Sequence, residues 1–415
     1  MSSIPVTTAG GSAASGHPRP PPSFLDRVPL YPAEQEAAPS RVCVTGATGY
    51  VAGPIVARLL AAGHTVHATS RDPGNMETVA PLMSLPGATE RLRLFRADLL
   101  KEGSYDEAVA GCDFVIHTAS PFALGMSRRD VRRKLIDPAV RGVENVLASV
   151  NRTPTVRRVV LTSSIAATMS TRADHGVDRP VDETCWNGTA SESWLPYSYS
   201  KTLAERRAWE LNRQQCRWSL VTVLPGFVLG PFLGSSRSAS ESVGLLRRLA
   251  LGWLFWPACP NMGVPHVDIR DVAAAHCLAM VTPNASGRYL AVSGGAGLRA
   301  MTSLLASLYP GGRIRAPLLD APRWAVWLLA PLFDMGRDTV SATWGPPPAF
   351  ATRRAAQELG MRSWLPLEAS LYDMVEDMAG KGMIRHPLPA ARRRRDGEGA
   401  GVVAGKGGDA PGVEV

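Results

Sequence analysis

Two side chains four residues apart are the best candidates for chemistry in this sequence. Tyr197-Ser-Tyr-Ser-Lys201 begins a predicted helix, and the four-residue spacing places Tyr197 and Lys201 on one face of it. An ammonium group beside a phenol favours the phenolate and brings the phenol's pKa, about 10 in isolation, closer to neutral pH. Such a tyrosine can give or take a proton. The same pattern also occurs at an ordinary exposed helix start, so the surrounding fold must decide between the two.

A glycine-containing turn is the second candidate. Residues 45–52 read T-G-A-T-G-Y-V-A and join a predicted buried strand, 41–45, to a predicted helix, 50–62. Glycine permits a tight turn there and lets backbone N–H groups approach a pyrophosphate at the positive end of the helix. This context predicts a dinucleotide-binding loop, and a strand-to-helix turn without a ligand is the alternative. The predicted cofactor contacts in the loop are Gly46, Thr48, Gly49, Tyr50 and Val51.

The end of the next predicted strand, 65–69, indicates which dinucleotide binds. NAD enzymes usually place an acid there to hold both ribose hydroxyls. Here Ser70-Arg71-Asp72 presents a guanidinium first, which suits bidentate contact with a 2′-phosphate. Arg71 therefore predicts NADP(H), and the alternative is a solvated strand end in which Arg71 pairs with Asp72.

Hydroxyl side chains close another predicted strand, 158–163. Residues 161–164, Leu-Thr-Ser-Ser, close this strand at the edge of the sheet where ligands bind in open α/β folds. A hydroxyl there could donate a hydrogen bond to a substrate carbonyl, or the Ser and Thr residues could only satisfy backbone groups at the strand end.

The elements that must position these residues alternate along the chain. Short apolar segments predict strands at 41–45, 65–69, 92–96, 114–118, 158–163 and 220–224. Helical patterns lie between them at 50–62, 105–110, 130–150 and 197–214. Short apolar strands that alternate with helices require right-handed crossovers, so we predict an α/β, doubly wound parallel sheet (Rossmann).

The predicted organisation has four segments. Residues 41–225 form the NADP-binding part and 226–385 a smaller, mostly helical substrate-binding part, with late helices at 352–359 and 367–378. Residues 1–40 and 386–415 are rich in Pro, Gly, Ala or Ser, and we predict a disordered extension and a disordered tail. The extension could instead be a transit segment for a plastid or mitochondrion.

Composition narrows the class of protein. The 415 residues are 45% hydrophobic and 20% charged, which is ordinary for a folded globular chain. Six widely separated cysteines, without a C-x-x-C pair, predict reduced thiols in a cytoplasmic protein and no metal site. The net charge of +9 includes the run Arg392 to Arg395, which we interpret as a solvated tail and not as a nucleic-acid arm.

In their order along the chain, these motifs resemble the extended short-chain dehydrogenases/reductases. The similarity is to the branch of dihydroflavonol reductases, cinnamoyl-CoA reductases and related aldehyde or ketone reductases, over about residues 41 to 380. The matching segments are 45–49, 68–73, 97–99, 117–121, 162–164, 182–186, 197–205, 224–226, 230–231 and 266–268.

The resemblance implies roles for individual residues. Ser164, Tyr197 and Lys201 would form the catalytic triad. The implied cofactor contacts outside the loop are Asp98 and Leu99 at the adenine, Thr118, Ala119 and Ser120 along the cofactor, Tyr197 and Lys201, and Pro225, Gly226 and Val228 near the nicotinamide. Two positions depart from the family pattern: Ala52 replaces the third glycine of the loop, and residues 194–200 lack the aromatic signature of cinnamoyl-CoA reductases.

The predicted function is an NADPH-dependent reductase that transfers hydride to an aldehyde or ketone. A hydroxysteroid-type dehydrogenase, an epimerase or dehydratase, and a nonenzymatic NADP-binding scaffold remain alternatives. The predicted partner is a small-molecule carbonyl or alcohol substrate. Asp268 is predicted to cap a helix rather than to act as a catalytic carboxylate.

Two apolar stretches, 245–260 and 324–333, are shorter than the roughly 20 residues that a membrane-spanning helix needs. We expect both to form helices packed on the smaller part. Lining a hydrophobic substrate pocket or touching a membrane surface are the alternatives for both.

Overall fold

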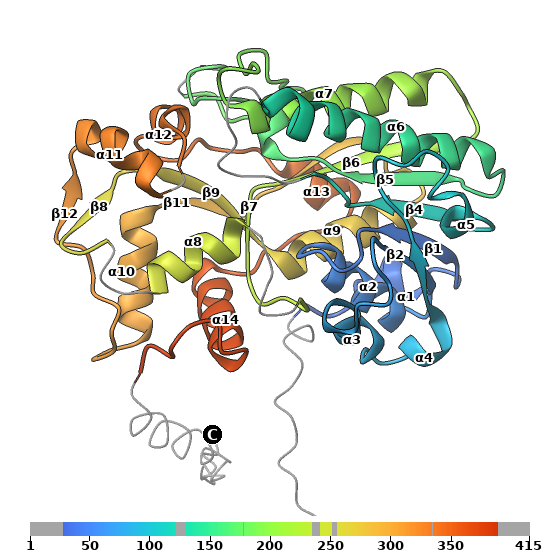
Figure 1. The fold of residues 1–415 in the computed structure, drawn as a ribbon, viewed down its shortest axis with the longest axis horizontal. Coiled ribbons are helices and arrows are strands. Elements are labelled where there is room, and N and C mark those ends of the chain that lie inside the picture. Colours follow the sequence, from blue (N-terminus) through green and yellow to red (C-terminus); the bar gives the residue numbers. More distant parts are fainter. Residues whose placement is uncertain are drawn as a thin grey trace, which may run out of the picture.

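A computed structural model of the chain describes residues 28–121, 130–176, 178–234, 241–250, 255–333 and 335–388. Its centre is a seven-stranded sheet with the strand order β10-β6-β5-β4-β1-β2-β3 (Figure 1). Every neighbouring pair in this sheet is parallel, which confirms the predicted doubly wound α/β fold. The strands are β1 Arg41–Thr45, β2 Thr65–Ser70, β3 Leu92–Arg96, β4 Phe114–His117, β5 Arg158–Thr162, β6 Ser219–Pro225 and β10 Gly287–Ala291.

Helices cover both faces of the sheet because its strands are apolar on both sides. One core lies between the sheet and a layer containing α2 Ala52–Ala61, α3 Met76–Met83, α9 Ile269–Val281 and α13 Arg353–Glu358. The other core lies beneath α5 Asp106–Val109, α6 Asp137–Arg152 and α7 Pro196–Arg213. Figure 1 shows α6 and α7 on the opposite side of the sheet from α2 and α9. The short helices α4 Ala88–Arg91 and η2 Arg132–Ile136 precede β3 and α6.

The central sheet includes a strand from beyond residue 225. β10 pairs with β6 in parallel, although the sequence after 226 shows only a weak strand signal. Arg288 interrupts the apolar run of β10, yet it is buried because Glu205 on α7 pairs with it at 2.8 Å. A search for apolar runs does not detect a strand that contains a buried arginine. The strand is stable because a residue distant in sequence neutralises the arginine.

Residues 28–40 are part of the fold, which corrects the prediction of a disordered extension up to residue 40. The helix α1 Pro32–Gln35 packs against α9, and its Glu34 is almost fully buried. Arg58 of α2 pairs with the Glu34 carboxylate at 2.5 Å and also donates to the Val28 carbonyl at 2.9 Å. This segment is held by a buried ion pair and not by a row of apolar residues. The sequence therefore showed no apolar periodicity that would predict its fold. Residues 1–27 and 389–415 lie outside the described residues.

The second part of the chain has its own core and two small sheets. One sheet has the order β11-β9-β7 and the other pairs β12 with β8. The strands are β7 Phe227–Leu229, β8 Ala258–Pro260, β9 Gly263–Asp268, β11 Gly294–Gly297 and β12 Leu319–Ala321. The helices are α8 Glu241–Ala250, α10 Leu298–Leu308, α11 Arg323–Leu329, η4 Ala330–Phe333, α12 Arg337–Thr343 and α14 Leu367–Gly380.

A buried ionic cluster joins α9 to α14. Asp268 accepts the Arg270 backbone N–H at 2.8 Å, so Asp268 caps α9 as predicted. The Arg270 guanidinium pairs with Asp268 at 2.8 Å and with Asp373 of α14 at 2.7 Å. Ser370 of α14 also donates to Asp268 at 2.6 Å. The second part is therefore attached to the central sheet through the first turn of α9.

The two apolar stretches have different environments. Leu246 and Leu249 of α8 are buried in the second core, as expected for a packed helix. In contrast, α11 forms a helix that contacts α12 and η4 of the smaller part, as expected, but none of its own residues is buried. Residues 251–254 lie outside the described residues. Within the described ranges, no helix is long and apolar enough to cross a membrane.

Candidate active site

The glycine loop is folded tightly against the end of β4. Gly46 has a φ of 64°, a conformation that a side chain disfavours. A Cβ atom on Gly46 would lie 3.0 Å from the Cβ of Ala119, so a larger residue would also clash. The Gly46 N–H donates to Thr69 Oγ1 at 3.0 Å, which holds the loop at the carboxyl edge of the sheet. The loop ends at Val51, the residue that precedes α2, so its N–H groups are at the positive end of that helix.

Hydrogen bonds from Thr45 hold the end of β4 against the loop. The Thr45 hydroxyl lies 2.8 Å from His117 Nδ1 and accepts the Ala119 N–H at 3.1 Å. Thr118 Oγ1 donates to the Thr45 carbonyl at 2.5 Å. Burial, with a smaller contribution from the charge of Lys201, lowers the pKa of His117 to about 3. His117 is therefore a neutral structural group at neutral pH, and Thr118, Ala119 and Ser120 keep partly accessible surfaces.

Tyr197 and Lys201 lie in the first two turns of α7, directly opposite the end of β4. Pro196 occupies the start of the helix, a position that suits proline because no helical N–H is lost there. Lys201 Nζ donates to Ser120 Oγ at 3.1 Å and lies 5.9 Å from the centroid of the Tyr197 ring. Burial lowers the pKa of Lys201 to about 8, while the carboxylate of Glu205 opposes this shift. The ammonium form therefore predominates at neutral pH.

Ser164 precedes the short helix η3 Ile165–Ala167, against which α7 packs. Its hydroxyl accepts the Ala166 N–H at 3.2 Å, which is the strand-end role that the sequence left open. Accepting this bond uses a lone pair and leaves the O–H hydrogen able to donate. The same residue can therefore cap η3 and serve a ligand.

A buried network behind these residues was missed by the sequence analysis. Glu205 of α7 accepts from Ser163 at 2.6 Å and from Thr222 at 2.9 Å, in addition to its pair with Arg288. It therefore connects β5, β6, α7 and β10. An acid four residues after Lys201, on the same face of a helix, is the only sequence signal for it.

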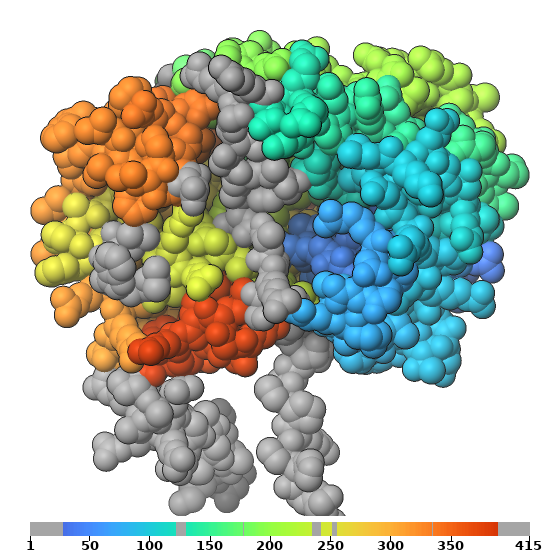
Figure 2. Space-filling view, in the orientation of Figure 1, coloured from blue at the N-terminus to red at the C-terminus, as the bar shows by residue number. Residues whose placement is uncertain are grey.

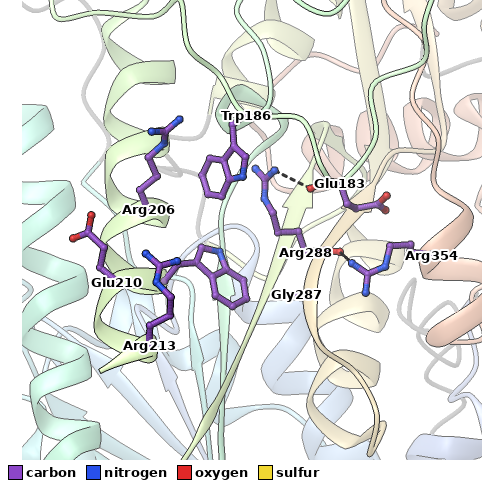
Figure 3. Close-up of a pocket in the computed structure, with 9 residues that line it drawn as sticks. Glu183, Trp186, Arg206, Glu210, Arg213, Gly287, Arg288 and Arg354 are labelled. Atoms are coloured by element: carbon purple, nitrogen blue, oxygen red, sulfur yellow. Dashed lines mark hydrogen bonds between the residues drawn. The ribbon is translucent and has the colours of Figure 1, made fainter. Parts of the chain in front are cut away.

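Arg288 is held by backbone carbonyls as well as by Glu205. Figure 3 shows its guanidinium beside Trp186 and bonded to the Glu183 carbonyl at 3.0 Å. The guanidinium carbon lies 3.9 Å from the centroid of the Trp186 ring. These residues border an open groove of about 600 Å³, which contains none of the predicted catalytic or cofactor residues.

Arg71 is exposed at the end of β2, where the sequence predicted a phosphate-binding cation. Asp72 pairs with Arg96 at 3.3 Å and not with Arg71, so the alternative ion pair with its neighbour is not formed. In the part of the chain that the structure describes, no polar group lies within hydrogen-bonding distance of the Arg71 guanidinium. This side chain remains available to a ligand.

Asp98 and Leu99 lie in the loop after β3. The Asp98 carboxylate is exposed and accepts the Leu100 N–H at 2.9 Å, which fixes the local turn. The Leu99 carbonyl accepts from Asn145 of α6 at 2.7 Å. Both residues are thus held at the same edge of the sheet as the loop and Arg71.

The remaining predicted contacts lie where the central sheet meets the second part. Pro225 ends β6, and Val228 lies in β7 opposite Val267 of β9. A Cβ atom on Gly226 would come within 3.0 Å of the Pro265 carbonyl oxygen, so only glycine fits this junction.

Tyr50 points from the loop toward the second part. Its hydroxyl donates to the Gly230 carbonyl at 2.9 Å, and its ring centroid lies 5.5 Å from that of Phe232. Its side chain therefore joins the two parts of the molecule. Because the side chain is engaged there, the predicted cofactor contact of Tyr50 would be made by its backbone.

The family match covers most of the described fold. Residues 42–292 match the model of the NAD dependent epimerase/dehydratase family. The chain belongs to this family. The match extends from β1 to the residue after β10. It therefore includes all seven strands of the central sheet and the segment of chain between β6 and β10.

Curated relatives agree with the branch that the motifs resemble. The chain is 37% identical over 342 residues to a cinnamoyl-CoA reductase of Medicago truncatula, a match that covers 82% of this chain and 96% of that protein. It is 41% identical over 279 residues to tetraketide alpha-pyrone reductase 1 of Arabidopsis thaliana, covering 66% of this chain and 83% of the relative. The predicted membership of the dihydroflavonol reductase and cinnamoyl-CoA reductase-like branch is confirmed.

Solved structures share the fold. Vestitone reductase from alfalfa superposes with a TM-score of 0.64 at 26% identity, covering 83% of this chain and 100% of that one. A yeast methylglyoxal/isovaleraldehyde reductase complexed with NADPH superposes with a TM-score of 0.68 at 25% identity, with the same coverage.

Proposed function

We propose that this chain, an oxidoreductase that uses NADP(H), reduces an aldehyde or ketone with Ser164, Tyr197 and Lys201 as its catalytic residues. The position of Lys201 carries the proposal. Its ammonium donates to Ser120 just after β4 and lies beside the Tyr197 ring, so a phenol and a cation meet at the strand end against which the glycine loop is folded. The reductases among the relatives support the same reaction class.

The residues at the carboxyl edge of the central sheet fit NADP(H). The glycine loop ends at the start of α2, where backbone N–H groups and the positive end of the helix suit a pyrophosphate. Arg71, exposed and without a protein partner in the described ranges, suits the 2′-phosphate. We assign Asp98 and Leu99 to the adenine end and Gly226 to the nicotinamide end.

When bound, NADPH supplies the hydride that adds to the carbonyl carbon. The Tyr197 phenol donates its proton to the carbonyl oxygen, so that the two additions together yield an alcohol. Lys201 is charged at neutral pH and stabilises the phenolate that remains on Tyr197. Ser164 uses its free O–H hydrogen to orient the carbonyl and to stabilise the negative charge that develops on its oxygen.

Two further groups keep Lys201 in place. Ser120 accepts one of its N–H bonds, and the Glu205 carboxylate raises the pKa that burial lowers. Because Glu205 also binds Ser163, the residue before Ser164, one buried carboxylate supports both sides of the triad. We assign Glu205 as a positioning residue, since it does not reach the reacting atoms.

Replacing Tyr197 by Phe tests the proposed reaction. We expect kcat to fall at least about 100-fold, because the general acid is removed, while the Kd for NADPH changes less than about threefold. Tyr199→Phe is the matched control, since Tyr199 lies in the same turn and should retain activity. A Tyr197→Phe enzyme that kept more than about a tenth of kcat would exclude Tyr197 as the proton donor.

Arg71→Asp tests the cofactor assignment separately. This change removes a charge-assisted contact to the 2′-phosphate and adds repulsion, so we expect NADPH to bind at least about 30-fold more weakly and NADH almost unchanged. Arg93 is an exposed arginine on β3, and Arg93→Asp is the control because it changes the net charge by the same amount. Equal affinity of the unmodified enzyme for NADPH and NADH would refute the assignment.

An assay with a panel of carbonyl compounds would identify the substrate class. NADPH consumption should be measured with aldehydes, flavanonols, acyl-CoA thioesters and sterol ketones. We propose that an apolar carbonyl compound is the substrate, on the basis of the names that the relatives carry. If no carbonyl compound supported NADPH oxidation, a nonenzymatic NADP-binding role would replace this proposal.

A further inference from the structure

The outer end of the second part carries a large exposed apolar surface. We call it the α11 face and define it by six side chains of α11 and η4: Trp324, Trp327, Leu328, Leu329, Leu332 and Phe333. Their exposed fractions range from 41% for Phe333 to 77% for Leu332. Exposed Leu318, Leu319 and Trp256 extend the surface over the start of β12 and the segment before β8. Figures 1 and 2 show this region at the end of the molecule opposite the helices α2 to α4.

Packing within the chain does not account for this surface. None of the seven residues of α11 is buried, although Trp324, Trp327 and Leu328 follow a helical spacing that places them on one side. A helix of this length is marginal in water without a face to pack on. Contiguous exposed apolar patches of this kind mark places where a soluble domain meets another surface.

The charges around the α11 face are mostly positive. The Arg337 guanidinium carbon lies 4.4 Å from the centroid of the Trp327 ring, and that of Arg315 lies 5.0 Å from the Trp256 ring. Arg323 begins α11 and is exposed.

Two nearby acids among the described residues are already engaged. Asp320 pairs with Arg299 at 3.3 Å, and Asp338 accepts the Leu195 N–H at 2.9 Å. The described part of the α11 face therefore combines Trp, Leu and Phe with cations at its border.

We propose that the α11 face binds the surface of a membrane that contains anionic lipids. Tryptophan and leucine enter the boundary between headgroups and acyl chains, and arginines at the same depth pair with lipid phosphates. The helix would lie in the plane of the interface, because the described chain has no helix that could span a bilayer.

Charge decides between a membrane and a second copy of this chain. A symmetric dimer through the α11 face would bring Arg323 and Arg337 toward the same residues of its partner, with a net charge of +9 on each chain. An anionic lipid surface instead neutralises these cations. The proposal concerns attachment only and does not depend on the proposed reaction.

Vesicle sedimentation tests the proposal. The full chain should bind vesicles of phosphatidylcholine mixed with phosphatidylserine, and bind phosphatidylcholine alone at least about tenfold more weakly. The triple variant Trp324→Ser, Leu328→Ser, Leu332→Ser should bind the mixed vesicles at least about tenfold more weakly than the unmodified chain.

The matched control removes exposed apolar side chains at the other end of the molecule. Met76→Ser with Met83→Ser changes α3, whose two methionines are 62% and 41% exposed, and should leave vesicle binding unchanged. Thermal unfolding of both variants should stay within a few degrees of the unmodified chain, because every substituted side chain is exposed. If the triple variant unfolds, Trp324→Ser alone provides the same test with a smaller loss.

A second variant separates the cationic contribution. Arg323→Gln with Arg337→Gln should remove most of the preference for phosphatidylserine, and the remaining binding should depend less on salt.

Three outcomes would overturn the proposal. Full vesicle binding by the triple variant would assign attachment to another basic segment such as residues 392–395. The second is failure of the unmodified chain to bind either kind of vesicle. The third is a dimer, detected by light scattering, that the triple variant converts to a monomer, in which case a second copy covers the α11 face.

Discussion

Helices α9 and α11 are both rich in apolar residues, but their surroundings are opposite. Every residue of α9 from Ile269 to Met280 is buried between the central sheet, α2 and α1, whereas α11 buries none. Figure 1 shows α9 beneath the central sheet and α11 at the outer end of the second part. Apolar composition therefore predicts that a helix needs a neighbouring surface, but it does not say whether that surface belongs to the same chain.

The polar groups of α9 show what such burial requires. His276 Nδ1 donates to the Val272 carbonyl at 2.7 Å, and its Nε2 accepts from the Thr162 hydroxyl at 2.7 Å. Burial lowers the pKa of His276 to about 4, so the ring stays neutral inside the core. Arg270 is charged but is held by Asp268 and Asp373. On α11, by contrast, polar groups such as Arg323 remain in contact with water.

The largest expected effect comes from removing the buried guanidinium of α9. Arg270→Met leaves the carboxylates of Asp268 and Asp373 buried without their cation, and we expect a loss of about 3 to 5 kcal/mol in the free energy of unfolding. Arg337→Met, next to α11, should cost less than about 0.5 kcal/mol because that side chain is exposed. Urea unfolding of both variants measures the difference, and similar losses would invalidate the comparison.

A matched pair of leucines sharpens the comparison. Leu278 of α9 is fully buried, and Leu328 of α11 is 54% exposed. We expect Leu278→Ala to cost about 2 to 5 kcal/mol, since it leaves a cavity in a close-packed core. Leu328→Ala should change the free energy of unfolding by no more than about 0.5 kcal/mol. A large loss at Leu328 would mean that α11 is covered in solution, and its dependence on protein concentration would distinguish a second copy from a segment of the same chain.

The smallest expected effect concerns pH and belongs to α9 alone. Burial raises the pKa of Asp271 to about 7, partly offset by the Leu365 N–H that its carboxylate accepts at 2.8 Å. Its pKa in the unfolded chain is about 3.9, so the folded state binds the proton more tightly and this group's contribution to stability falls as pH rises from about 4 to 7. Asp271→Asn removes the titration and retains an acceptor for Leu365.

Stability measured across this pH range tests the prediction. The unmodified chain should lose about 3 kcal/mol more than Asp271→Asn between pH 4 and pH 7. Parallel stability profiles for the two proteins would show that Asp271 is ionised in the fold at no cost.

The sequence predicted the elements around the cofactor edge well because their signals are local. Six of the seven strands of the central sheet are short apolar runs, and each appears within about two residues of its predicted bounds. Gly46 was predicted as a turn residue, and the structure adds the reason, its contact with Ala119. Tyr197 and Lys201 were predicted as candidates from their spacing on one helix, and their catalytic role stays a prediction.

The elements that were missed depend on partners far away in the chain. β10 was missed because Arg288 interrupts it, and the fold of residues 28–40 was missed because Glu34 is polar. Each becomes a buried element only through its ion pair, with Glu205 in the first case and Arg58 in the second. A local pattern cannot show that a charge will be neutralised by a residue 24 or more positions away.

The sequence by itself predicted the doubly wound fold, the glycine loop, NADP(H) as the cofactor, and the family. These features follow from residue type and short-range spacing, which fix turns, helical faces and apolar strands directly. Only the tertiary structure decided that Glu205 and Arg288 form a buried network behind the proposed catalytic residues, and that α9 is enclosed while α11 is open. Burial is a property of the neighbours that surround a residue, and those neighbours are brought together by the fold and not by the order of the chain.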